Sequence, residues 1–280
     1  MRSSSLALVG VISVVGLSAC SITADGNSVT FKTVPEFVDS SQPAKSSTGD
    51  WNGEEIKITN AGVNPLTGEG GIVITVDPSA TKVTASAIFA ARADTESEAQ
   101  LSIKDAIQTF TLSESNGFQI ACAHGQDHGT SKVAASGCKL LRVTIPAGTV
   151  DKPMNLNISS GQGGIRFSGT VIAKTVLANE AGLGDLDIKV TPVKDADINL
   201  KGDNKVTLSL PSDFSAKSVT LKVNESNEAD AAKRIITTDF QGLENGGSYP
   251  TAGATENAAA LIALESRGLL DDYTVTLKRQ

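Results

Sequence analysis

The chain has few aromatic side chains and no apolar run long enough to span a membrane as a permanent helix. Aromatic residues make up 4 % of its 280 residues, and Trp51, Tyr249 and Tyr273 are its only Trp and Tyr residues. Few flat side chains are therefore present on which sugar rings could stack. The apolar run at 6–17 covers about 12 residues, whereas a membrane-spanning helix needs about 20. This run is too short to stay in a bilayer as a helix.

Motifs that mark common enzyme sites are also missing. The sequence contains no G-x-S-x-G nucleophile elbow, no Walker loop, no H-E-x-x-H and no G-x-G-x-x-G that opens a helix after a strand. The glycine run at 161–164 precedes an expected strand, which indicates a turn. We therefore expect a non-enzyme without a cofactor. The alternative is an envelope carbohydrate-active enzyme that uses a carboxylate pair as acid and base on a β-helix.

Basic charge is in deficit. The chain has 24 Lys and Arg against 31 Asp and Glu, a net charge of −7. Residues 1–19 contain one base, Arg2, so the remainder has 23 bases against 31 acids and a net charge of −8. This surplus of acidic side chains disfavours nucleic acid as a partner, and it also disfavours membrane attachment through a basic patch.

The first twenty residues contain an export signal. A positive start at Arg2 is followed by the apolar run at 6–17 and by the small residues Ser18 and Ala19 before Cys20. The pattern resembles the lipobox of bacterial lipoproteins. The resemblance implies a signal peptide at 1–19, acylation of Cys20 with palmitate-type chains, and a place in the cell envelope with the membrane as partner. An Asp directly after the lipidated Cys resembles a cue that retains lipoproteins in the inner membrane. This chain has Ser21 at that position, so we expect the outer membrane if the host is Gram-negative.

The next segment is poor in apolar side chains. Residues 21–50 are rich in Ser, Thr, Gly and Asp, and 40–47 offers too few apolar groups to offset the entropy of ordering. We therefore expect residues 20–50 to form a lipidated Cys with a flexible tether. Residues 51–280 are then long enough for a single β domain with a sizeable core.

Short segments with an apolar residue at every second position predict β-strands with one buried face. They are 55–59, 71–76, 82–87, 110–112, 117–120 and 139–145. The motif Thr95-Glu96-Ser97-Glu98 fits a capping box, and apolar residues then recur at helical spacing, so one short helix is expected near 95–108. Residues 273–277 alternate and are expected to form the last strand at the end of the stack. Residues 256–264 fit either a helix or, over 260–264, a strand.

A repeated polar-apolar-polar-apolar unit occurs in the second half of the chain. Its copies at 164–167, 185–188 and 205–208 are offset by 21 and then 20 residues, a spacing typical of solenoid coils. Stacked copies would place Ile165, Leu186 and Val206 in one ladder, and Phe167, Ile188 and Leu208 in the next. We expect a mainly β, solenoid-like or β-helix-like stack, with hairpins in a β-sandwich as the alternative.

Several glycine-led alternations are similar to a known family. They are 143–148, 156–165, 184–188 and 206–211. Together they resemble the bacterial adhesin-like domain of unknown function, over roughly residues 51–280. The resemblance implies a β-helical or solenoid body, often on a lipoprotein. It implies no active site.

Both histidines and the remaining cysteines lie in one stretch. Cys122 and Cys138 are expected to pair, because an exported protein meets an oxidising compartment. Their bond would close a loop of about 15 residues and contribute about 3 kcal/mol. The weaker alternative is a zinc site of Cys122, Cys138, His124 and His128, although structural zinc sites usually take their cysteines from a C-x2-4-C knuckle.

Two acidic pairs also have a spacing suited to hard cations. Asp185 with Asp187, and Asp195 with Asp197, are two residues apart, so on a strand each pair projects to one side. A solvated strand face is the favoured interpretation. The expected function is that of a lipid-anchored envelope protein with a structural, adhesive or partner-binding role, whose partner is another envelope protein or a surface polymer.

Overall fold

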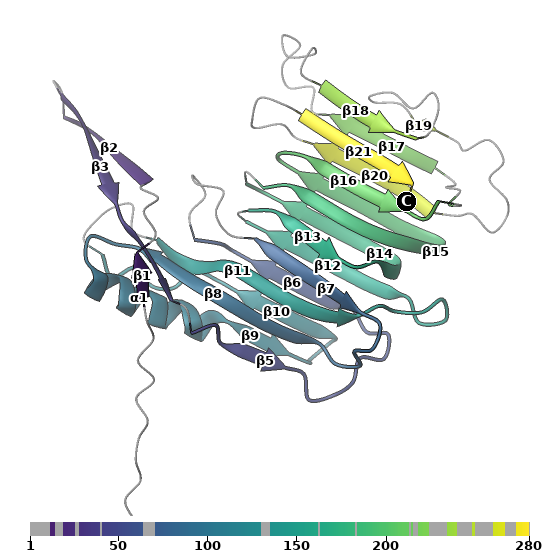
Figure 1. Cartoon of the computed structure of the whole chain (residues 1–280), viewed down its shortest axis with the longest axis horizontal. Coiled ribbons are helices and arrows are strands. Elements are labelled where there is room, and N and C mark those ends of the chain that lie inside the picture. Colours follow the sequence, from purple (N-terminus) through teal and green to yellow (C-terminus); the bar gives the residue numbers. More distant parts are fainter. Residues whose placement is uncertain are drawn as a thin grey trace, which may run out of the picture.

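The computed structural model describes most of the chain. The described residues are 12–14, 19–25, 28–39, 41–63, 71–129, 135–161, 163–182, 184–212, 214, 218–223, 234–239, 248–249, 260–266 and 273–279. They form a mainly β body with one helix, α1 (Glu96–Thr109). This confirms the expectation of a mainly β protein with one helix. Figure 1 shows the strands stacked side by side into a long, curled sheet.

Two rows of parallel strands make up the body, and every neighbouring pair within a row is parallel. Row 1 contains, in spatial order, β11 (Ala135–Pro146), β7 (Ile72–Asp77), β13 (Ile165–Ser168), the start of β15 (Leu186–Gly202), β16 (Val206–Leu210), β21 (Tyr273–Arg279) and β18 (Arg234–Thr238). Row 2 contains β10 (Phe118–Cys122), β6 (Ile56–Asn60), β12 (Met154–Ser160), β14 (Val171–Glu180), the end of β15, β20 (Ala260–Ser266) and β17 (Ser218–Val223).

The register of row 1 follows the spacing of the repeat. Ile165 lies opposite Leu186, and Leu186 lies opposite Val206. Ile188 lies opposite Leu208, whereas Phe167 lies opposite Ile74 on β7. All of these side chains are buried in one shared core. The alternation of the sequence therefore sends alternate residues inward along most of the strands whose side chains the structure describes.

Antiparallel strands close the amino-terminal end of the stack. Strand β8 (Thr84–Arg92) pairs with β11, with β4 (Glu36–Asp39) and with β5 (Ala44–Ser46). Strand β9 (Thr111–Ser113) pairs with β10, and β1 (Ile12–Val14) pairs with β4. Strands β2 (Ala19–Asp25) and β3 (Ser28–Val34) form a separate hairpin (Figure 1). The short β19 (Ser248–Tyr249) lies against β17 at the other end.

The predicted helix is confirmed within a residue at each end. Thr95 caps α1: its hydroxyl accepts from Glu98 N–H, and the Glu98 carboxylate accepts from Thr95 N–H. This is the reciprocal arrangement that the motif predicts. The inward face of α1, including Ala99, Ile103 and Ala106, is buried, and the helix packs against β8 and β11.

The segment expected to be a flexible tether is partly built into the body. Residues 36–39 and 44–46 form strands on β8, so the boundary expected at residue 51 is wrong. The carboxylate of Glu36, which is 1 % exposed, lies 3.4 Å from the Arg92 guanidinium, itself 1 % exposed. It also contacts the Lys139 ammonium on β11. An ion pair this deeply buried holds β4 in place, because separating the charges inside the protein is expensive.

The carboxyl-terminal strands do not follow chain order. Strands β20 and β21 pair with β15 and β16 on one side and with β17 and β18 on the other. Residues 273–277 were expected at the end of the stack, whereas β21 lies inside it. Residues 260–266 form a strand and not a helix. Residues 256–259 lie outside the described part.

Buried polar side chains mark the turns between row 2 and row 1. Asn60 lies opposite Ser160, and Ser160 lies opposite Glu180, each at the end of its strand. Asn60 donates to Gly71 O at 3.0 Å, Ser160 donates to Gly163 O at 2.9 Å, and Glu180 accepts from Asp203 N–H at 3.1 Å. Each side chain thus bonds turn backbone that would otherwise lie buried without a partner.

Candidate functional site

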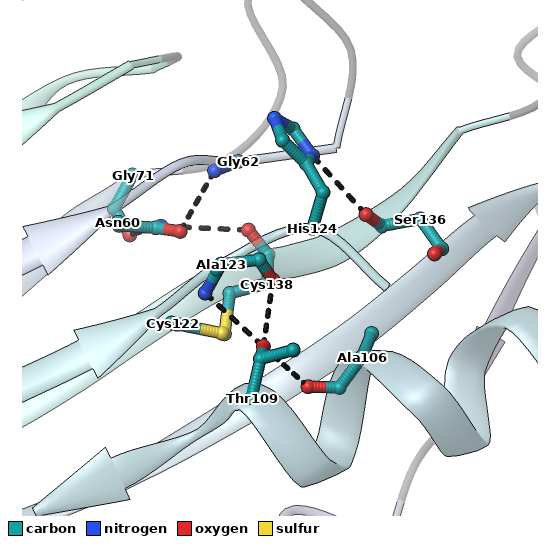
Figure 2. Close-up of a disulfide and its surroundings, with 10 residues drawn as sticks. All are labelled: Asn60, Gly62, Gly71, Ala106, Thr109, Cys122, Ala123, His124, Ser136 and Cys138. Carbon is teal, nitrogen blue, oxygen red and sulfur yellow. Dashed lines mark hydrogen bonds between the residues drawn. A yellow bond between two sulfur atoms is a disulfide. The ribbon is translucent and has the colours of Figure 1, made fainter. Parts of the chain in front are cut away.

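The structure brings the two predicted disulfide cysteines together. Cys122 ends β10 and Cys138 lies in β11, with their Cα atoms 6.2 Å apart and their sulfurs at bonding distance. Both are buried. The Thr109 hydroxyl, at the end of α1, accepts from Ala123 N–H at 3.1 Å and contacts Ala106 O at 2.7 Å (Figure 2). This cluster ties the helix to both strands.

The two histidines of this stretch have separate partners. His124 Nδ1 lies 3.2 Å from Ser136 O, and its ring points away from the sulfur atoms (Figure 2). His128 Nε2 lies 2.6 Å from an Asp105 carboxylate oxygen on α1. The zinc arrangement considered for these residues is therefore not formed. Within the described residues, no three His, Cys, Asp or Glu side chains gather closely enough to hold a metal ion.

The structure does not place the acidic pairs on regular strand faces. Asp185 precedes β15 in a turn, where its carboxylate accepts from the Asn204 side chain at 2.8 Å. Asp187 lies within β15, opposite Arg166. Asp195 has a φ of 58°, which bends β15 between its row 1 and row 2 halves, so Asp195 and Asp197 do not alternate as on a flat strand.

A groove of about 360 Å³ follows the turns between the rows. Gly71, Gly164 and Gly184 line it, together with Arg166, Asp185 and Asn204. A Cβ atom on Gly184 would overlap the backbone of Gly164, and one on Gly164 would overlap Asp185. The glycines are therefore required by the close stacking of successive turns, and packing accounts for this groove.

A larger surface pocket surrounds the only Trp of the chain. It has a volume of about 650 Å³, within the range of about 300–1,000 Å³ typical of small-molecule sites. Its walls come from three segments that are distant in sequence: 50–52, the turn 78–81 after β7, and the turn 146–152 between β11 and β12. We call it the Trp51 pocket.

Hydrogen bonds hold the walls of the Trp51 pocket. Trp51 N–H donates to Thr81 O at 2.7 Å, and the indole N–H donates to Glu54 O at 2.7 Å. Lys152 Nζ donates to Asn52 Oδ1 at 2.6 Å, and the Thr81 hydroxyl donates to Asp50 at 3.1 Å. The pocket thus combines one half-buried aromatic ring with a rim of one anion, one cation and an amide.

Sequence reasoning noted Trp51 as an isolated aromatic residue and missed its pocket. Asn52 and Lys152 are 100 residues apart, and no local motif joins them. The one available signal was the Pro and Gly content of the two turns, 77–79 and 146–148, which predicts tight loops but not that they meet.

The backbone of Cys20, the predicted lipidation site, lies in β2 opposite Thr33. Among the described residues, no helix has the length and apolarity to cross a membrane. In comparisons with known proteins, no family model, no curated protein and no solved structure matches this chain.

Proposed function

We propose that this chain is a lipid-anchored protein of the bacterial cell envelope with a non-catalytic, partner-binding role. The motif Leu17-Ser18-Ala19-Cys20 supports the anchor, and the partner is another envelope protein or a surface polymer. The Trp51 pocket is the observation that carries the binding role. It is preformed, it opens on the outside of the body, and its rim groups are held by hydrogen bonds.

We further propose that the body is a β-solenoid. The support is the parallel register that repeats through row 1 and row 2, with apolar residues aligned from strand to strand. In a β-sandwich, neighbouring strands joined by hairpins would be antiparallel. A stack of this kind is rigid along its axis, which suits a protein that presents a site at a fixed place above a membrane.

The anchor is tested by metabolic labelling with a palmitate analogue in bacteria that express the full chain. We expect the wild-type protein to carry the label, and Cys20→Ser to lose both the label and its place in the membrane fraction. Ser18→Thr, which leaves the thiol in place, is the matched control. An unlabelled wild-type protein would contradict the anchor.

The binding role is tested by crosslinking the anchored protein in living cells. We expect a partner whose recovery depends on protein concentration and falls when Trp51 is replaced by Ala. Turnover of envelope glycans by the purified protein, abolished by single carboxylate substitutions that preserve folding, would instead favour an enzyme.

A further inference from the structure

Trp51 offers a fixed aromatic surface at the outside of the body. Both of its N–H groups already donate to protein carbonyls, at Thr81 and Glu54. One side of the residue packs against the hydrophobic core, and the side chain as a whole is half-buried. With both N–H groups already bonded, what remains for a ligand is apolar ring surface, and little ordering of the ring is needed when a ligand binds.

The rim of the Trp51 pocket supplies hydrogen-bond donors and acceptors, and charges of both signs. Asp50 is an acceptor, Lys152 is a donor, and the Asn52 amide is both. All three are exposed, and the two charges cancel. The turn that holds Lys152 is itself fixed, because Thr149 N–H donates to Lys152 O at 2.9 Å and Lys152 N–H donates to the Thr149 hydroxyl at 3.0 Å. Ligand hydroxyl groups, which donate and accept, suit such a rim.

This combination selects among ligand classes. A nucleic acid is disfavoured by the net charge of −7. A proline-rich peptide requires a groove lined by several aromatic side chains, whereas Trp51 is the only aromatic residue among the described pocket walls. A pyranose ring has a C–H face, which is attracted to the negative face of an indole, and a hydroxyl edge that matches the rim.

We infer that the Trp51 pocket binds a neutral saccharide, with one pyranose ring stacked on Trp51 and its hydroxyl groups bonded to Asp50, Asn52 and Lys152. The inference rests on the proposed partner-binding function and names the class of its ligand as part of a glycan. A bound saccharide also leaves the charged rim groups exposed to solvent at their outer side, so neither is buried alone.

The test uses the full-length protein, solubilised in a detergent without a sugar headgroup and applied to an array of neutral bacterial and plant glycans. The best glycan is then titrated while the emission of Trp51 is followed, since no other Trp contributes to the signal. We expect saturable binding that shifts this emission and shields the ring from acrylamide. Isothermal calorimetry provides the same Kd without relying on Trp51.

Four variants in the pocket and one control variant distinguish loss of the site from loss of the fold. Trp51→Ala should weaken binding by about tenfold or more, whereas Trp51→Phe, which keeps an aromatic face, should retain part of it. Lys152→Ala and Asn52→Ala should also weaken binding while leaving the circular dichroism spectrum unchanged, which keeps the test valid if Trp51→Ala fails to fold. Leu101→Ala, at an exposed position on α1, is the matched control and should bind as wild type.

The outcomes are distinguishable. If no neutral glycan binds, or if binding persists unchanged in both Trp51→Ala and Lys152→Ala, the saccharide inference is wrong while the envelope role can still stand on labelling and crosslinking. If the bound glycan is cleaved, the pocket is a saccharide site and the non-catalytic role is wrong. Binding of a proline-rich peptide in preference to every glycan would also overturn the inference.

Discussion

Buried charge at single positions holds the amino-terminal strands. Glu36 joins β4 to Arg92 on β8 and to Lys139 on β11, across 56 and 103 positions of sequence. Composition alone predicted a flexible tether here, because Glu36 lies in a polar segment whose partners are distant. This one carboxylate therefore links β4 to two strands that are distant in sequence.

Replacing Glu36 by Ala should destabilise the protein by about 3–5 kcal/mol, since it removes the carboxylate that lies against a buried guanidinium. Urea denaturation followed by circular dichroism measures the change. Adding Arg92→Met to Glu36→Ala should recover part of the loss, because the second buried charge is then removed as well. Equal stability of wild type and Glu36→Ala would show that β4 is not held by this pair.

Glu114 should give the protein a pH-dependent stability. Hydrogen bonds from Thr48 N–H and Gly49 N–H, with one from the Thr48 hydroxyl, hold the pKa of Glu114 below its ordinary 4.5. The folded state thus favours the carboxylate. The hydrogen bonds to the Glu114 carboxylate therefore stabilise the folded protein above the ordinary pKa. This stabilisation is lost as the pH falls through the lowered pKa.

The measurement is the melting temperature of wild type and Glu114→Gln at pH 7 and at pH 3. We expect wild type to melt at a higher temperature than Glu114→Gln at pH 7, and the difference between them to shrink as the pH is lowered to 3, because it falls towards or through the lowered pKa of Glu114. Glu55→Gln, at another exposed glutamate near by, should show a smaller difference at pH 7. A difference independent of pH would refute the assignment.

The residue ranges of several strands and of the helix were predictable from the sequence, whereas the strands that lie beside them were not. Alternation predicted strands at β6, β7 and β11, and the capping box predicted α1, since these signals are local. The position of β21 inside the stack depends on pairings that leave no trace in its own residues. The Trp51 pocket was missed for the same reason, because its walls come from turns that meet only after the rows have formed.

The Cys122–Cys138 bond joins β10 to β11 next to α1, and its removal should loosen this end of the stack. In a Cys20→Ser background, replacing both cysteines by Ala should destabilise the protein by about 3 kcal/mol in the chain-entropy estimate. Urea denaturation with and without reductant measures it: reductant should destabilise the parent only. Mass spectrometry should show two hydrogens fewer than two free thiols require. A parent indifferent to reductant, or one retaining zinc with free thiols, would contradict the pairing.

Across the whole sheet, the order in which strands pair determines which strands depend on which for their hydrogen bonds. Strand β17 pairs with β20, and β18 pairs with β21. Among the described residues, neither β17 nor β18 pairs with β15 or β16. A chain that ends at residue 259 lacks β20 and β21. It should therefore be no more stable than a chain that ends at residue 217, which lacks β17 and β18 as well.

Comparing urea denaturation of these two shortened chains tests the order. Limited proteolysis should cut residues 218–238 of the longer one rapidly while β6 to β16 stay protected in both. Greater stability of the longer chain, with residues 218–238 protected, would mean that β17 and β18 can stack directly on β15 and β16.

The insertion of β20 and β21 between strands that precede them has a consequence for synthesis. Residues 218–238 are synthesised before residues 260–279. Strands β17 and β18 therefore lack their neighbours β20 and β21 until nearly the whole polypeptide has been made. Folding from the amino end can proceed only as far as β16 in the meantime. The sheet can therefore be completed only after residues 260–279 are available, and β17 and β18 are the last strands to gain their neighbours.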